Sequence, residues 1–244
     1  MIAIEINELS KKYKERFAVR SLSLSIRQGE VFGLLGVNGA GKTTTIRMLA
    51  CLTKPTSGEA TLLGRNILSE PQAVKEIINL SPQETAVAPN LTVRENLELI
   101  AGIYGNNRQA ASEKTTEMVK NLGLAEVEKE KAKILSGGWQ RRLSIAMALI
   151  SEPKILFLDE PTLGLDVLAR RELWSVIEKL EGETTMILTT HYLEEAQALS
   201  DRIGIMAKGK LKAIGTVDEL ISTTGAPTFE DAFVALATES GEAL

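Results

Sequence analysis

The chain has 244 residues, of which 44% are apolar and 25% charged, enough to build the core of one large domain or two small ones. Its net charge of −4, without any block of like charge, gives no indication of a nucleic-acid partner, and its single cysteine excludes an intrachain disulfide. We expect no signal peptide and no membrane span, because the N-terminal stretch lacks an apolar core and no apolar run approaches roughly 18 residues.

Short apolar runs alternate with helical patterns along the chain, which is typical of an α/β protein with a mostly parallel sheet covered by helices. We expect strands at residues 31–35, 155–158, 185–189 and 203–206. Each of these runs is short, apolar and bounded by turn or charged residues, as buried strands are.

The middle of the chain has helical spacing and few strand signals. One helix face is predicted there by the i, i+3, i+4, i+7 positions of Leu143, Ala146, Met147 and Ile150. We therefore predict a helical subdomain at residues 84–152, inserted into a body formed by residues 1–83 and 153–225. A short C-terminal helix within residues 226–244 is predicted by the same spacing of Phe229, Ala232, Phe233 and Leu236.

Residues 36–43 read GVNGAGKT and fit the phosphate-loop pattern G-x-x-x-x-G-K-[ST], directly after an expected strand and before a helical pattern. Glycines let successive N–H groups face a phosphate, and the helix N-terminus adds partial positive charge. Lys42 can reach the β- and γ-phosphates, and the Thr43 hydroxyl can ligate Mg²⁺. The alternative is a Gly-rich turn without a ligand. The predicted nucleotide contacts are Gly36, Val37, Asn38, Gly39, Ala40, Gly41, Lys42, Thr43 and Thr44.

A second candidate feature is the pair of carboxylates that ends the strand expected at residues 155–158. Ligands of parallel sheets bind at the carboxyl ends of the strands, so Asp159 can hold Mg²⁺ through its water shell. Glu160, one residue further, can face the attacking water as a general base. Alone, this pattern also fits a solvated acidic pair at a strand end; beside a phosphate loop, it favours catalysis.

Residues 135–140 read LSGGWQ and resemble the signature motif LSGGxQ of the ATP-binding cassette (ABC) ATPases. By itself a Ser-Gly-Gly triplet is often only a turn that begins a helix. Here it lies between the phosphate loop and the acidic strand end, where that family has it, and N–H groups at a helix start favour an anion. The resemblance assigns nucleotide contacts to Ser136, Gly137, Gly138 and Gln140.

Three further positions match the same family in order along the chain. Tyr13 stands where these ATPases carry an aromatic residue that stacks on adenine. Gln83 resembles the glutamine that contacts Mg²⁺ and the water and that senses the membrane subunit. His191, the only histidine, resembles the switch histidine that approaches the γ-phosphate. Residues 161–166 resemble the loop that crosses the dimer interface, and Val37 departs mildly from the proline that is frequent at its position.

The resemblance, which spans about residues 2–236, implies a P-loop NTPase core, an N-terminal antiparallel β region and an inserted helical subdomain. It also implies that the chain binds ATP and Mg²⁺ and hydrolyses ATP. Two nucleotides would lie between the phosphate loop of one subunit and the signature of the other. The implied partners are a second copy or a paralogue and a membrane permease, which would hold the chain on the cytoplasmic face; its region 84–104 would face the permease.

The sequence at residues 190–196 and 229–233 resembles that of the ATPases of type 2 ABC exporters, which move drugs, antibiotics, sodium or polysaccharides outward. We expect no additional β-domain of the sugar-importer type after the helix near Glu219 and no fused membrane helices. An importer ATPase remains the first alternative. A soluble ABC ATPase acting on DNA or ribosomes remains a second alternative, although the chain has no sustained heptads and a single cassette.

Overall fold

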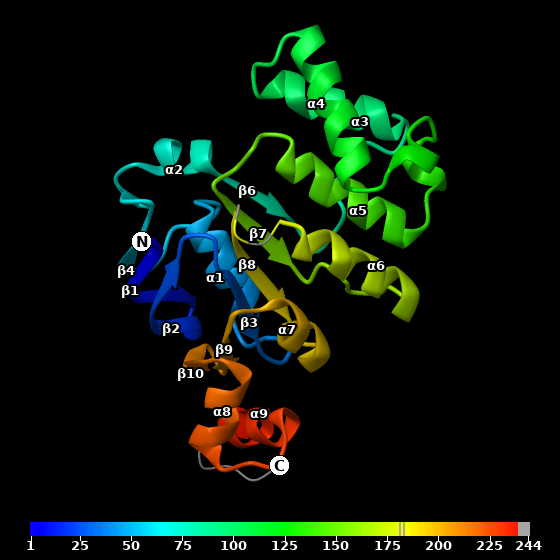
Figure 1. The fold of residues 1–244 in the computed structure, drawn as a ribbon. Coiled ribbons are helices and arrows are strands. Elements are labelled where there is room, and N and C mark those ends of the chain that lie inside the picture. Colours follow the sequence, from blue (N-terminus) through cyan, green and yellow to red (C-terminus); the bar gives the residue numbers. More distant parts are fainter. Residues whose placement is uncertain (181, 183, 239–244) are drawn as a thin grey trace.

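The computed structural model describes residues 1–180, 182 and 184–238, and its strands form two sheets (Figure 1). The larger sheet contains, in spatial order, β10 (Lys210–Gly215), β9 (Arg202–Ala207), β3 (Val31–Leu35), β8 (Thr185–Thr190), β7 (Ile155–Asp159) and β6 (Ile78–Ser81). All neighbours in it run parallel except β10, which is antiparallel to β9. The predicted mostly parallel sheet is therefore confirmed.

The four strands expected from the sequence correspond to β3, β7, β8 and β9, with each expected run lying inside the observed strand. Every residue of β3, β7 and β8 is buried. Strands covered on both faces read as continuous apolar runs, which is why they are visible in the sequence. Strands β6 and β10 are partly buried and mix polar with apolar residues, so the sequence did not predict them.

The smaller sheet is antiparallel, as expected for the N-terminal region. Its spatial order is β2 (Arg16–Arg27), β1 (Ile2–Tyr13), β4 (Ser57–Leu62) and β5 (Arg65–Asn66). Helix α1 (Lys42–Leu49) contributes Ile46 to the same apolar core as Ile4 of β1 and Phe157 of β7. This shared core holds the β1–β2 hairpin beside the loop that precedes α1.

The helical stretch contains α3 (Val93–Ile103), α4 (Arg108–Asn121), two short 3₁₀ helices (Ala125–Val127 and Ala132–Ile134) and α5 (Gly137–Leu149) (Figure 1). On the predicted face, Leu143, Ala146 and Ile150 are buried and Met147 is partly buried. These helices share one apolar core with β7 and β8. The division into a body and a subdomain at residues 84–152 therefore stays a prediction.

The remaining helices are α2 (Pro71–Ile77), α6 (Val167–Glu178), α7 (Leu193–Leu199), α8 (Val217–Thr224) and α9 (Phe229–Thr238). Helices α8 and α9 pack together beside β9 (Figure 1), and Phe229, Ala232 and Leu236 are buried there. Residues 239–244 of the predicted C-terminal helix lie outside the described residues. Within the described ranges, no helix has both the length and the hydropathy needed to cross a bilayer.

Candidate functional site

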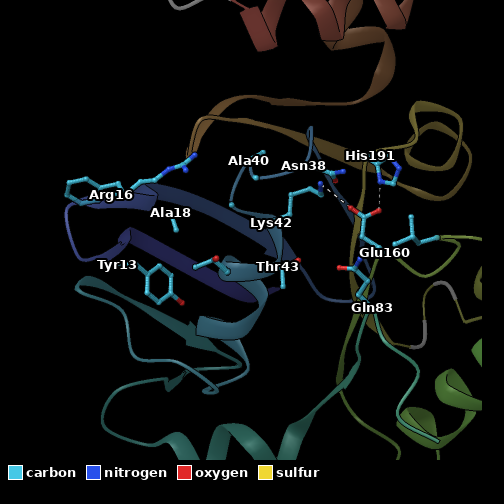
Figure 2. Close-up of a pocket in the computed structure, with 15 residues that line it drawn as sticks. Tyr13, Arg16, Ala18, Asn38, Ala40, Lys42, Thr43, Gln83, Glu160 and His191 are labelled. Atoms are coloured by element: carbon cyan, nitrogen blue, oxygen red, sulfur yellow. Dashed lines mark hydrogen bonds and ion pairs between the residues drawn. The ribbon is translucent and has the colours of Figure 1, made fainter.

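A cavity of about 610 Å³ lies where the β1–β2 hairpin faces the loop between β3 and α1 (Figure 2). One wall is the phosphate loop, and the opposite wall carries Gln83, Glu160 and His191. The strand order explains this meeting point. Strands β3, β8 and β7 are adjacent and parallel, so the residues that follow their carboxyl ends lie side by side.

The phosphate loop leaves its backbone free to bind an anion. Gly41, the residue before α1, has φ 109° and no side-chain cap, and a Cβ there would collide with the carbonyl of Ala18. Gly39 has φ 81°. Both angles lie in the region that favours glycine. The N–H groups of the first turn of α1 are therefore directed at the cavity, as in anion sites at helix N-termini.

Three residues predicted to be functional meet at one carboxylate. Lys42 Nζ lies 3.1 Å from Glu160 Oε1, and His191 Nδ1 lies 2.7 Å from Glu160 Oε2 (Figure 2). Lys42 also donates to the carbonyl of Gly36 at 2.6 Å, and its side chain is 5% exposed. Low exposure makes such charge-assisted contacts stronger than they are at the surface.

The backbone at Glu160 is held in a sparsely populated conformation. Its φ is 49°, which is uncommon for a residue other than glycine. Its N–H donates to the carbonyl of Thr189 at 3.1 Å and to the Thr189 hydroxyl at 3.0 Å. Residues held in this way are found at functional sites, where neighbouring structure imposes the geometry. Here β8 fixes the direction of the Glu160 side chain.

Oxygen ligands of the kind that Mg²⁺ prefers lie beside the phosphate loop. The Thr43 hydroxyl donates to Asp159 Oδ1 at 3.0 Å, and the Thr189 hydroxyl donates to the same oxygen at 2.6 Å. Gln83 lines the cavity together with Thr43. In the described part of the chain, no three His, Cys, Asp or Glu residues form a metal-binding group. The residues here that could contribute an oxygen ligand to such an ion are Thr43, Asp159 and Gln83.

The β1–β2 hairpin forms the open end of the cavity. Tyr13 is 49% exposed and lines it, with Lys11 Nζ 5.0 Å from the centre of its ring. Arg16, Phe17 and Ala18 line the same end and were not predicted. The only available signal was that these three follow the predicted Tyr13 after a short turn.

The signature residues lie elsewhere in the single chain. None of Ser136, Gly137, Gly138 and Gln140 lines the cavity that contains Lys42. Ser136 caps α5 by accepting a hydrogen bond from the N–H of Trp139 at 3.5 Å. The Gln140 amide donates to the carbonyls of Ala132 and Leu135, so it stabilises its own loop. Their nucleotide contacts remain a prediction, which would need a second copy or a paralogue of the chain.

Arg141 is a residue of the site that the sequence reasoning missed. Its guanidinium is buried and donates to the carbonyls of Pro82 at 2.6 Å, Gln83 at 2.5 Å and Glu160 at 3.3 Å. Desolvation lowers the pKa of Arg141, while the carboxylates of Asp159, Glu195 and Glu160 oppose that shift. Arg141 therefore connects the start of α5 to the backbones that carry two of the predicted catalytic residues.

Comparison with known proteins agrees with this geometry. Residues 19–163 match the family described as ABC transporter. The chain is 42% identical over 224 residues to the daunorubicin/doxorubicin resistance ATP-binding protein DrrA of Streptomyces peucetius, covering 91% of this chain and 68% of that protein. It is also 42% identical over 217 residues to the human phospholipid-transporting ATPase ABCA3, covering 87% of this chain but only 13% of that protein.

A solved structure extends the comparison to the fold. The dimeric, post-hydrolysis ATP-binding cassette MJ0796 with bound ADP and Pi superposes with a TM-score of 0.78. The two chains are 27% identical, and the match covers 87% of this chain and 98% of that one. The similarity therefore extends over nearly the whole of a single cassette.

Lys42→Ala should weaken ATP binding while the fold survives. Charged hydrogen bonds contribute about 1.5–3 kcal/mol, so we expect ATP affinity to fall about 10- to 100-fold. Titration calorimetry measures this loss, and circular dichroism checks the fold. Lys129→Ala, at an exposed position remote from the cavity, is the matched control. Retention of wild-type affinity by a folded Lys42→Ala chain would remove Lys42 from the site.

Glu160→Gln should keep the shape of the side chain but lose the carboxylate. General-base catalysis contributes typically 10²- to 10⁴-fold, so turnover should fall by about that factor. ATP should bind at least as tightly, because Lys42 no longer has an ion-pair partner to give up.

Asp159→Asn provides the contrast, since it should lose Mg²⁺-dependent affinity as well as rate. Steady-state hydrolysis and equilibrium binding, measured for both variants with and without Mg²⁺, separate the two carboxylates. If Glu160→Gln hydrolyses ATP within a few-fold of wild type, Glu160 is not the base.

Proposed function

The chain belongs to the ABC transporter family, and we propose that it binds and hydrolyses ATP at a dimer interface to drive export through a separate membrane subunit. The observation that supports this most directly is the convergence of Lys42, Glu160 and His191 on the wall of one cavity beside a phosphate loop. We assign Lys42 to the phosphates, Glu160 to the water as general base and His191 to the γ-phosphate; a phosphate-binding cation and a group that orients or deprotonates the water are recurring parts of phosphoryl-transfer sites.

The proposed reaction divides the work among residues of this chain. Lys42 and the loop N–H groups bind the β- and γ-phosphates, and Tyr13 stacks on adenine. The oxygen of the attacking water bonds to the γ-phosphorus while the bond between that phosphorus and the β–γ bridging oxygen breaks. The Glu160 carboxylate accepts the proton that the water loses. Mg²⁺, when bound by Thr43, Asp159 and Gln83, would offset the charge on the phosphate oxygens.

The contacts of Glu160 suggest how nucleotide binding is linked to catalysis. Lys42 and His191 both contact its carboxylate. A polyphosphate competes for Lys42 and approaches His191, and so leaves the carboxylate available to a water molecule. Hydrolysis would then depend on occupancy of the cavity, because a bound polyphosphate would draw Lys42 away from the carboxylate.

A second copy would complete each site. The signature residues are remote from the cavity of their own chain, and the similar cassette MJ0796 is dimeric. Ser136 is exposed, as contact with a partner's nucleotide would need. Closing and opening of such a dimer would move attached membrane subunits as rigid bodies.

The proposed permease would dock near Gln83 and would hold the chain on the cytoplasmic face of a membrane. A groove of about 490 Å³ lies between α1 and the loop after Gln83, and it includes Leu52 and Pro82. In the adjoining α3 segment, Ile103 and Tyr104 are large and exposed. We favour export over import because the relative DrrA is a drug-resistance ATP-binding protein.

Ser136→Arg should abolish turnover while ATP binding to the single chain stays near wild type, because this serine would act on the partner's nucleotide. ATP hydrolysis measured over a dilution series, with calorimetry in parallel, tests this. Ser69→Arg, at another exposed serine, should hydrolyse ATP normally. A specific rate that is the same at every dilution of the wild-type chain would exclude the split site.

Cysteines introduced at Leu99, Ile103 and Tyr104, in a Cys51→Ser background, should crosslink to the co-expressed membrane protein. A cysteine at Val234 on α9, which is exposed but lies far from α3 (Figure 1), is the control. Mass spectrometry of the crosslinked product identifies the positions. Crosslinks from the control position alone would refute the docking surface.

A further inference from the structure

The hydroxyl group of a threonine on β8 joins the two acidic residues to which we assign Mg²⁺ and the attacking water. Thr189 Oγ1 lies 2.6 Å from Asp159 Oδ1, and the backbone nitrogen of Glu160 lies 3.0 Å from Thr189 Oγ1. All three residues are buried, with Thr189 0% exposed, Asp159 4% and Glu160 5%. Thr189 itself has no role in the reaction proposed for this site.

The chemistry of the three groups determines the direction of both hydrogen bonds. An ionised carboxylate can only accept and a backbone N–H can only donate. The hydroxyl proton of Thr189 therefore faces Asp159, and a lone pair of the same oxygen faces the N–H of Glu160. Each bond polarises the hydroxyl in the sense that strengthens the other. One hydroxyl thus restrains the side chain of one acidic residue and the backbone of the next.

The register of the sheet brings Thr189 to this position. Strands β7 and β8 run parallel, and Asp159 is paired with Thr189. The backbone of β8 supplies one bond by itself, because the N–H of Glu160 also donates to the carbonyl of Thr189 at 3.1 Å. Any residue at position 189 offers that carbonyl, but the bond to the Asp159 carboxylate needs a hydroxyl. The side chain of Thr189 therefore adds a restraint that the sheet does not provide.

Asp159 Oδ1 accepts a hydrogen bond from a second hydroxyl, that of Thr43 on α1, at 3.0 Å. Thr43 lines the cavity and would itself be a ligand of Mg²⁺ in the proposed reaction. Thr189 lies inside the sheet and is not among the residues that line the cavity. Of the two hydroxyls, that of Thr189 can therefore hold the Asp159 carboxylate without being a ligand.

We propose that Thr189 is a positioning residue whose hydroxyl orients the Asp159 carboxylate for Mg²⁺ and holds the backbone of Glu160 so that its carboxylate faces the attacking water. The proposal rests on the proposed ATPase function. Thr189 touches neither nucleotide nor water; it acts through Asp159 and Glu160. Groups that hold metal ligands in place typically contribute about 10- to 100-fold to metal affinity or activity.

Thr189→Val tests the role of the hydroxyl, because it keeps the shape of the side chain and the backbone carbonyl. We expect the gain in ATP affinity that Mg²⁺ provides to fall about tenfold and kcat to fall about 10- to 100-fold, while ATP affinity in EDTA stays within about twofold of wild type. Calorimetry with and without Mg²⁺, and steady-state hydrolysis by the full chain, measure these changes. Thr189→Ala also lacks the hydroxyl and should show the same losses.

Thr189→Ser separates positioning from a merely structural role, because it keeps the hydroxyl and loses a buried methyl group. The lost methyl leaves a small cavity, so this variant should unfold at a lower urea concentration than wild type. It should nevertheless hydrolyse ATP at close to the wild-type rate and keep its Mg²⁺-dependent affinity. For a merely structural threonine, activity would instead decrease together with stability. Urea unfolding followed by circular dichroism supplies the stability of each variant.

Thr185→Val is the matched control, at the other end of the same strand. Thr185 is 3% exposed, and its hydroxyl accepts a hydrogen bond from the N–H of Gly29 at 3.0 Å. This variant should bind and hydrolyse ATP as wild type does.

Two results would overturn the inference about Thr189. One is wild-type rate and Mg²⁺-dependent affinity in a folded Thr189→Val chain, and the other is an equal loss in Thr189→Ser or Thr185→Val. The wild-type chain distinguishes the two levels of failure. If it neither binds nor hydrolyses ATP, the proposed function fails and this inference fails with it; if it does both and Thr189→Val matches it, this inference alone is wrong.

Discussion

The central interaction of the structure is the contact of one buried carboxylate, that of Glu160, with both Lys42 and His191. The three residues are far apart in the sequence and meet only because β3, β8 and β7 are adjacent and parallel. Lys42 and Glu160 are both buried, so the cost of desolvating the two charges opposes their ion pair, and good geometry must offset that cost. The hydrogen bonds from the Glu160 N–H to Thr189 of β8 provide that geometry. The order of the strands therefore determines how the proposed catalytic residues are placed.

Several hydrogen bonds hold the backbone and side chains on the Glu160 side of the cavity. The Thr189 hydroxyl donates to the Asp159 carboxylate, and the N–H of Glu160 donates to both the hydroxyl and the carbonyl of Thr189. Arg141 donates further hydrogen bonds to the carbonyls of Gln83 and Glu160. If these residues act as proposed, groups held by so many hydrogen bonds would need little reorganisation when a substrate arrives.

Sequence patterns predicted the parts of the fold whose signal is local. The buried strands β3, β7 and β8 read as apolar runs, and the phosphate loop reads as a fixed spacing of glycines and a lysine. The long strands of the β1–β2 hairpin alternate buried and exposed residues irregularly, with several register shifts, and no pattern gave their bounds. Arg141 was missed for another reason: its partners are distant in sequence, and only folding brings them together.

The position of the single histidine has a practical consequence. His191 is the only imidazole in the chain, and its ring lies 2.7 Å from the proposed base. In a proton NMR spectrum the ring signals of that residue stand alone, without overlap from other histidines. The protein thus carries its own probe at the reaction centre, and occupancy of the cavity can be followed by chemical shift without any label.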